Sequence, residues 1–285
     1  MRGRSSSRPA ARPYDALGPA LGWLRAPLIA VSGLVALFLL VPILVILPSS
    51  LSGGPFLGFP PKGISLTWYH SVIASPDWRE AFARSGRVAG EGAVIATAAG
   101  TAAALGLTRL TRGGNALRAV FIVPLVIPSI VYALGLYTFL NRFSLLGPEW
   151  PVAVGQAMLS LPVVVIVVSA ALAAIDPALL RAAAGLGMRW PGIILRIELP
   201  LVKRSLAGAF VIAFTLCFDE VVVALFVGAP GNDTVPAHLW NSAQSNLAPD
   251  IAAVSIIVIL TAFVGLGLAA ILLRRRTATP LAVAE

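Results

Sequence analysis

Charged residues are scarce in this sequence. Asp, Glu, Lys and Arg make up 12% of the 285 residues, whereas soluble domains carry about 25%. Hydrophobic residues make up 58% and the mean hydropathy is +0.90, so a water-soluble globular protein is excluded. A bilayer core of about 30 Å takes roughly 20 apolar residues per helix, and the sequence contains six charge-poor stretches of about that size.

Side chains that bind metals or nucleotides are also few. Cys217 is the only cysteine, which excludes a disulfide framework and a thiolate metal site and favours a packing role. His70 and His238 fall in different predicted loops, so no metal site is predicted. Neither Lys62 nor Lys203 belongs to a G-x-x-x-x-G-K-[ST] motif, and no H-E-x-x-H or G-x-S-x-G run occurs. We therefore expect no enzyme activity and no cofactor in this chain.

The predicted fold class is an all-α membrane protein with six transmembrane helices. The spans are expected at residues 27–47, 84–107, 119–140, 151–175, 205–228 and 251–273. Residues 26–273 then form the transmembrane domain, flanked by cytosolic tails at residues 1–25 and 274–285. The first apolar run is longer than the roughly 7 to 15 residues of a signal peptide, so an uncleaved helix is expected.

Orientation follows from the distribution of positive charge. Six spans place both termini on one side, together with the segments that follow spans two and four. Most of the 21 Lys and Arg residues lie on that side, and cytosolic segments carry such an excess. We therefore expect both termini to be cytosolic. The same bias explains the net charge of +9 and predicts no nucleic-acid partner.

Local spacing predicts contacts and breaks within the spans. Span two carries a small residue at every fourth position, which permits close packing against a neighbouring helix. These residues are Gly92, Ala96, Gly100 and Ala104. Arg87 and Glu91 are four residues apart and predict an ion pair near the external surface. In span three, Pro124 and Pro128 each remove a backbone donor and predict a kink or a break.

The segment between spans one and two, residues 48–82, is rich in glycine and proline. We interpret it as an external loop. Its aromatic residues Trp68, Tyr69 and Trp78 are expected at the membrane interface, where such side chains are enriched.

The cytosolic segment between spans four and five is too long and too polar to be a simple turn. Asp176 followed by Pro177 is a helix-start signal, with Asp as the N-cap and Pro at the first helical position. The Leu/Ala run after it predicts one short helix that ends near Gly187. A short rigid helix of this kind can dock in a groove of a cytosolic partner.

This segment resembles the cytoplasmic loop of ABC importer permeases. The family pattern is Glu-Ala-Ala, three residues, Gly, nine residues, and then Ile, any residue, Leu-Pro. The residues that match it are Ala182, Ala183, Gly187, Ile197, Leu199 and Pro200. Arg181 departs from the pattern, because the family usually has Glu there. The resemblance implies that these residues, with Arg181 as a variant position, couple the permease to an ATPase subunit.

The resemblance covers residues 66–273 and is greatest to the second permease of spermidine/putrescine importers. It rests on Phe-Asp-Glu at 218–220 with a Val run after it, on Thr-Val-Pro at 234–236, and on Thr-Trp-Tyr at 67–69. It implies a type I permease fold in the bacterial inner membrane and a polyamine as the substrate. The implied partners are a second permease, two ATPase subunits that bind ATP and Mg²⁺, an external solute-binding protein and membrane lipid.

Asp219 and Glu220 place two carboxyl groups inside predicted span five. A charge near the centre of a bilayer costs at least about 2.5 to 3.5 kcal/mol, unless it faces a cavity or a partner. One hypothesis is that at least one carboxylate lines the translocation path and stabilises a cationic substrate. The alternative is a structural pair that caps a backbone or binds an arginine of a partner subunit.

Other functions share some of these features. A permease for an opine, an amino-acid derivative or a metal ion would have the same loop and spans. An ion-coupled secondary transporter could use Asp219 and Glu220 as proton relays, but residues 176–200 would then be unexplained. A membrane assembly protein without transport would leave the two carboxylates unexplained. An ATP-driven permease accounts for both features.

Overall fold

The computed structural model describes residues 22–55, 58–110, 114–229, 231–245 and 249–273. Every regular element in these residues is helical, which confirms the all-α class. The elements are α1 (Gly22–Ser50), α2 (Thr67–Ala74), α3 (Pro76–Leu107), α4 (Gly114–Ile122), a 3₁₀ turn (Val123–Leu125), α5 (Ser129–Arg142), α6 (Trp150–Ala173), α7 (Pro177–Gly185), α8 (Trp190–Ile193), a π turn (Ile194–Glu198), α9 (Leu199–Asp219), α10 (Val222–Val227), α11 (Val235–Ser245) and α12 (Asp250–Leu273). The predicted tails lie outside the described residues, except for residues 22–25.

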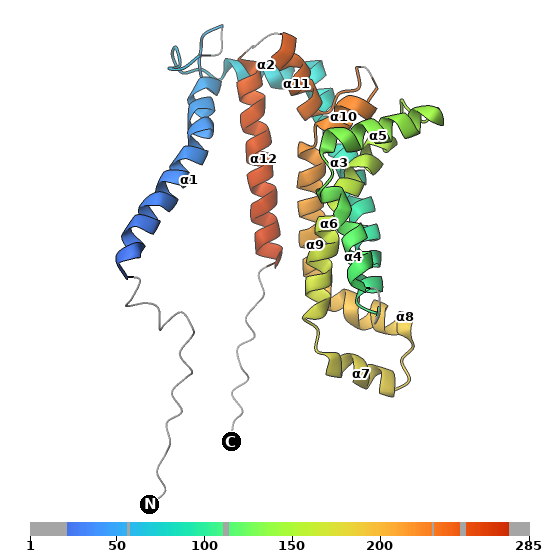
Figure 1. The fold of residues 1–285 in the computed structure, drawn as a ribbon. Helices are drawn as coiled ribbons and strands as arrows, with labels where there is room; N and C mark the ends of the chain where they lie inside the picture. The colour runs from blue at the N-terminus through green and yellow to red at the C-terminus, as the bar shows by residue number, and fades with distance from the viewer. Residues whose placement is uncertain (1–21, 56–57, 111–113, 230, 246–248, 274–285) are drawn as a thin grey trace, which may run out of the picture.

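The described residues contain five helices that are long and apolar enough to cross a membrane, and the bent pair of α4 and α5 makes a sixth candidate. The other five are α1, α3, α6, the run from α8 to α9, and α12. In Figure 1, the start of α1, the end of α12 and α7 lie at one end of the molecule, and α2 and α11 lie at the other. This is the arrangement that six crossings with both termini on one side require.

Span two begins earlier than predicted, because its helix starts at Pro76 rather than near residue 84. Ser75 is the N-cap, and its Oγ accepts a hydrogen bond from the backbone N–H of Trp78. Trp78 therefore lies in the first turn of α3 rather than in a loop, and it is 4% exposed. Tyr69 lies in α2, where its hydroxyl shares a 2.8 Å hydrogen bond with Ser50 of α1.

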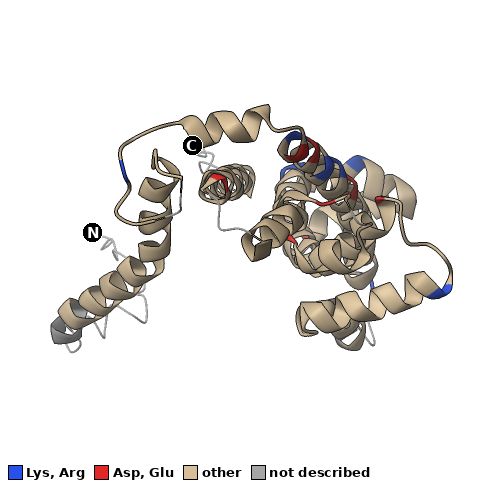
Figure 2. Cartoon of the chain, turned by 90° about the horizontal axis from the view of Figure 1, so that it is seen from above, with Lys and Arg blue, Asp and Glu red and all other residues tan. Residues whose placement is uncertain are grey.

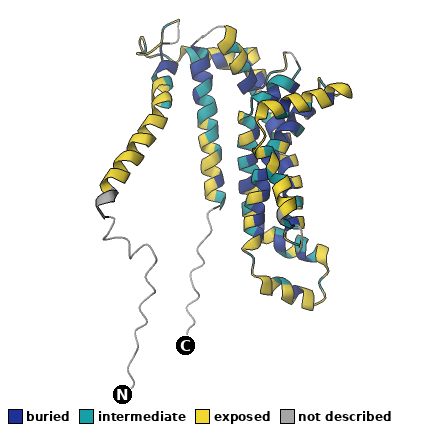
Figure 3. Cartoon of the chain, viewed as in Figure 1, coloured by how far each residue is buried: buried dark blue, intermediate teal, exposed yellow. Residues whose placement is uncertain are grey.

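The main hydrophobic core lies where α3, α6 and α9 pack together (Figure 3). Small side chains let these helices approach closely. A Cβ atom added to Gly100 would lie 2.7 Å from Cγ1 of Val164, and one added to Gly92 would lie 3.0 Å from Sγ of Cys217. The predicted close packing along span two is confirmed, and Cys217 is a buried packing residue.

Replacing Gly100 by alanine is expected to destabilise the protein by about 1 to 3 kcal/mol, because overpacking forces α3 and α6 apart. Gly106 lies on the same helix, and a Cβ atom there would meet nothing within 4 Å. The Gly106→Ala protein is therefore the matched control, and it should be neutral or more stable by up to about 1 kcal/mol. Thermal unfolding midpoints of the two variants in detergent measure this difference. Equal midpoints would contradict the packing described for Gly100.

Span three is broken rather than continuous. Its two halves, residues 116–125 and α5, meet at an angle of 96°. Pro124 and Pro128 supply no backbone N–H across this region, and α5 begins directly after Pro128. The predicted break within span three is confirmed. Beyond the break, α5 packs against α10 and α6 at the upper end of the bundle in Figure 1.

Span five also differs from its prediction. A continuous helical run extends from Trp190 to Asp219, so it begins well before residue 205. The run ends at Glu220, whose backbone is extended, with φ −76° and ψ 116°. After this break the chain continues in α10. The apolar stretch predicted at 205–228 therefore combines the end of one helix with a second, short helix.

The first helix, α1, stands apart from the bundle over most of its length (Figures 1 and 3). Large apolar side chains along it are exposed, including Leu34 and Phe38. Contacts with the rest of the described chain gather near its end, where Ser49 and Ser50 are buried. Its apolar surface must therefore be covered by lipid or by another protein.

Candidate functional site

The segment between spans four and five contains the short helix predicted from its capping residues. Asp176 is the N-cap of α7, and its Oδ1 accepts a 2.8 Å hydrogen bond from the backbone N–H of Ala178. The chain leaves the helix through Gly187, whose φ of +83° lies in the left-handed region that favours glycine. The backbone N–H of Gly187 donates to the carbonyl of Ala184, which closes the last turn. The predicted start and end of this helix are both confirmed.

Four residues of the predicted coupling loop come together around one cavity of about 470 Å³ between α7 and the π turn. They are Ala182, Ala183, Gly187 and Ile197. Only Ala183 is buried on α7. The structure does not bring the other predicted residues to this cavity, since Arg181 is exposed on α7 and Leu199 and Pro200 begin α9. The role of all of them in coupling stays a prediction.

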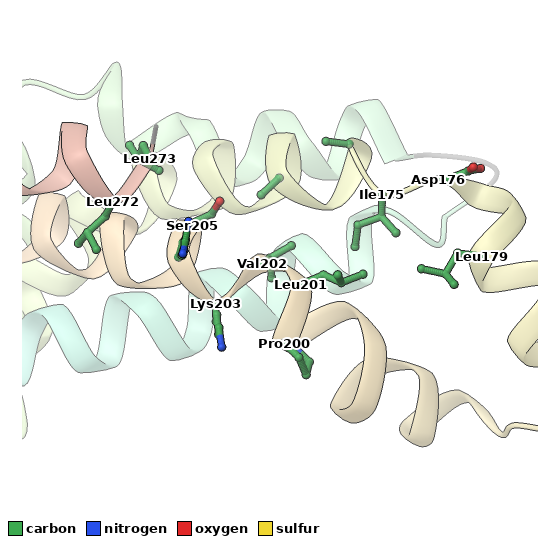
Figure 4. Close-up of a pocket in the computed structure, with 13 residues that line it drawn as sticks. Ile175, Asp176, Leu179, Pro200, Leu201, Val202, Lys203, Ser205, Leu272 and Leu273 are labelled. Carbon is green, nitrogen blue, oxygen red and sulfur yellow. The ribbon is translucent and has the colours of Figure 1, made fainter. Parts of the chain in front are cut away.

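A second cavity, of about 700 Å³, separates the base of α7 from the ends of the long helices. Figure 4 shows Ile175 and Asp176 on one side of it, Pro200 to Lys203 along α9, and Leu272 and Leu273 at the end of α12. Because this space is open, α7 is joined to the bundle mainly through its two connecting segments. The helix therefore projects from the end of the molecule (Figure 3).

The predicted carboxylates lie at the break between α9 and α10. Asp219 is the last residue of α9, and its side chain is exposed. Glu220 instead caps α10, because its Oε1 and Oε2 accept hydrogen bonds of 3.0 and 2.8 Å from the backbone N–H groups of Val222 and Val223. The two side chains therefore have different surroundings. Glu220 has a structural partner in the backbone, and Asp219 has no hydrogen-bonding side-chain partner among the described residues.

Two polar residues that the sequence did not point to support this break. Gln156 of α6 is 2% exposed, and its Nε2 donates a 3.3 Å hydrogen bond to the carbonyl of Glu220. The hydroxyl of Tyr132 in α5 donates a 3.0 Å hydrogen bond to the carbonyl of Gly155. The sequence did hold a signal, because Gln156 is an amide side chain in an uncharged predicted span, and such a group needs a partner.

A cluster of charges joins α3 to the start of α6 at the opposite end from α7. Arg84 and Arg87 both contact Glu80 and Glu149, over N–O distances of 2.9 to 3.2 Å. Figure 2 shows basic and acidic residues side by side over the start of α3. The predicted pair of Arg87 with Glu91 is wrong, because Glu149, distant in sequence, lies closer in space. Glu91 is exposed and forms no ion pair with a described residue.

The hydrogen bond from Arg87, supported by that from Arg84, lowers the pKa of Glu149 relative to its usual value, although burial acts in the opposite direction. A lowered folded-state pKa contributes stability above the unfolded-state pKa, and this stability is lost as the pH falls through the folded-state pKa. The link between α3 and α6 is therefore intact at neutral pH and weakens only in acid.

Sequence comparison places these features in a known family. The family described as "Binding-protein-dependent transport system inner membrane component" matches residues 96–278. The spermidine/putrescine transport system permease protein PotC of Escherichia coli (strain K12) is 29% identical over 231 residues, which are 80% of this chain and 86% of that protein. The putrescine transport system permease protein PotI of the same strain is 28% identical over 207 residues, covering 69% and 73% of the two chains.

Solved structures show the same fold at lower identity. A bacterial ABC transporter that imports the acidic polysaccharide alginate aligns with a TM-score of 0.71 and 19% identity, over 94% of this chain and all of that one. The MetNI methionine ABC transporter aligns with a TM-score of 0.54 and 17% identity, over 67% and 94% of the chains. The helical architecture, the candidate membrane spans and the family match all indicate the same kind of membrane protein. The chain belongs to the binding-protein-dependent transport system inner membrane component family, and it is an ABC importer permease of the inner membrane.

Proposed function

We propose that this chain forms half of the translocation pathway of an ATP-driven importer for a small cationic solute of the polyamine class. The similarity to PotC over 80% of the chain carries this proposal. A second permease completes the pathway, and an external binding protein delivers the solute. A separate pair of ATPase subunits binds ATP and Mg²⁺ on the cytosolic side, where both termini lie.

The surface of α7 supports its assignment as the contact with the ATPase. Leu186 is 90% exposed and Leu179 is 45% exposed, so apolar area on this segment has no partner in the described chain. A short projecting helix with an apolar surface fits the helix-in-groove mode of recognition. Arg181 adds positive charge to the same exposed helix, so the ATPase groove should present a carboxylate or no charge at this point.

A single helical run connects the α7 segment to the carboxylates. The helical run from Trp190 to Asp219 has 30 residues, which at 1.5 Å per residue is about 45 Å. It begins beside the α7 segment and ends at the break that holds Asp219. Closure of the ATPase pair would displace α7, and this run would carry the displacement toward the substrate pathway as a shift between inward-open and outward-open populations.

Asp219 is the carboxylate that the geometry favours for substrate. Glu220 is engaged by two backbone N–H groups, which leaves Asp219 exposed at the end of α9. A carboxylate at a helix C-terminus adds negative charge to the negative end of the helix dipole. A passing cation compensates both charges, which supports the proposed preference for a polyamine.

Reconstitution in liposomes tests this function. The chain is purified with the proposed second permease, ATPase and binding protein, and uptake of labelled putrescine and spermidine is measured. We expect uptake that requires ATP and Mg²⁺ and stops with a hydrolysis-deficient ATPase. ATP-independent uptake by this chain alone would identify an ion-coupled transporter instead. If the binding protein selects another solute, the permease role stands and the polyamine assignment is wrong.

A further inference from the structure

One arginine joins the end of α3 to the segment that connects α7 with α9. Arg109 lies two residues beyond the end of α3, and its Nη1 donates a 2.6 Å hydrogen bond to the carbonyl of Leu105 in the last turn. Cations and donors at this position satisfy free carbonyls and interact favourably with the helix dipole. The guanidinium group is thereby fixed to the core helix of the bundle.

The same guanidinium group contacts both ends of the segment formed by α8 and the π turn. Its Nη2 lies 2.6 Å from Oε2 of Glu198, the last residue of the π turn. Its Cζ lies 3.9 Å from the ring centroid of Trp190, the first residue of α8. Arg109, Trp190 and Glu198 therefore form one unit, which we name the α3 clamp.

The α3 clamp lies between the proposed coupling helix and the bundle. Trp190 follows the turn at Gly187 that ends the α7 segment, and Glu198 directly precedes α9. Glu198 is only 5% exposed, so its charge depends on Arg109 for a partner. A buried charge that loses its partner is strongly unfavourable, and the segment therefore cannot move away from α3 without a new partner for Glu198.

We propose that the α3 clamp transmits displacement of α7 to α3, so that α3 and α9 move together when ATP is hydrolysed. The three residues are positioning residues, and the inference rests on the proposed contact between α7 and an ATPase. The π turn between Trp190 and Glu198 is consistent with this role, because π turns inside α-helices are frequent at functional sites. Without the clamp, α3 would be linked to α7 only through its packing against α9. ATP hydrolysis would then be converted less efficiently into transport.

The experiment uses the complete transporter in liposomes, with Arg109→Gln, Glu198→Gln and the double variant. We expect each single variant to retain assembly with the ATPase and basal ATP hydrolysis, and to transport about fivefold less solute per ATP, an effect typical of altered coupling between sites. The double variant should be no worse than either single variant, because the two residues act as one unit. Trp190→Leu, at an exposed position, should give a smaller loss of about twofold in the same ratio.

Arg118→Gln is the matched control, since Arg118 lies exposed on α4, outside the proposed coupling segment, and forms no ion pair with a described residue. Its ratio of uptake to ATP hydrolysis should equal that of the wild type. Thermal midpoints of all variants are measured in parallel, because a purely structural role would lower the midpoint and the amount of protein but leave the ratio unchanged. An unchanged ratio, or additive losses in the double variant, would overturn the clamp. Failure of the wild-type transporter to couple uptake to ATP would instead overturn the proposed function.

Discussion

Replacing Leu186 by aspartate is expected to abolish most of the transport activity while leaving the chain folded. Leu186 ends α7 and is 90% exposed, so an aspartate there removes no packing within this chain. If α7 docks in an ATPase groove, the substitution puts a charge into an apolar contact. Loss of a central interface residue costs about 2 kcal/mol or more, which corresponds to binding weakened by more than about tenfold.

The measurements are co-purification of the ATPase and ATP-dependent uptake in liposomes, both of which should fall at least about tenfold. Leu110→Asp is the matched control, because Leu110 is also exposed, at 46%, and lies at the same end of the molecule, just beyond α3. The Leu110→Asp protein should still co-purify with the ATPase and show ATP-dependent uptake. If the Leu186→Asp protein retains the ATPase and transports normally, α7 is not the coupling helix.

Replacing Asp219 by asparagine is expected to reduce uptake of a cationic solute at least about tenfold at normal expression, the effect of losing roughly 1.4 kcal/mol of charge interaction. The amide has nearly the same size and lacks the charge. Asp219 has no hydrogen-bonding side-chain partner among the described residues, so the fold should be unaffected. The Asp219→Glu protein keeps the charge and should retain much of the uptake.

Glu220 provides the comparison for Asp219. The Glu220→Ala protein loses the side-chain cap of α10, which should lower its stability by about 0.5 to 2 kcal/mol. The Glu220→Gln protein keeps one acceptor for the backbone N–H groups and should be closer to the wild type in both stability and uptake. Labelled putrescine uptake, corrected for the amount of permease in the membrane, measures these effects. Wild-type uptake by the Asp219→Asn protein would exclude Asp219 from the pathway.

Signals that act within a few residues made parts of the structure predictable. Asp176 and Pro177 predicted the start of α7, and Gly187 predicted its end, because caps and left-handed turns depend on local chemistry. The small residues of span two predicted close helix packing because they recur at every fourth position. The break in span three was predicted from two prolines, but its 96° angle depends on how α5 packs against α10.

Contacts between distant residues could not be predicted from local spacing. Arg87 pairs with Glu149 rather than with Glu91, because the fold brings the start of α6 next to α3. The end of α9 at Glu220 was hidden by the Val-rich sequence after it, which is as apolar as a continuing span. The α3 clamp was missed for the same reason, since Arg109 and Glu198 lie in separate predicted cytosolic segments, after spans two and four, and meet only in the folded chain.

The isolation of α1 has a consequence for how the protein is made. A helix this apolar, with few tertiary contacts, gains enough from transfer into the bilayer to insert without help from the rest of the chain. By contrast, α3 carries Arg84, which pairs with Glu80 in the same helix and also with Glu149 at the start of α6. Insertion of the first helix and assembly of the bundle are therefore separable stages. A nascent chain can be anchored in the membrane long before the helices that carry out transport have met.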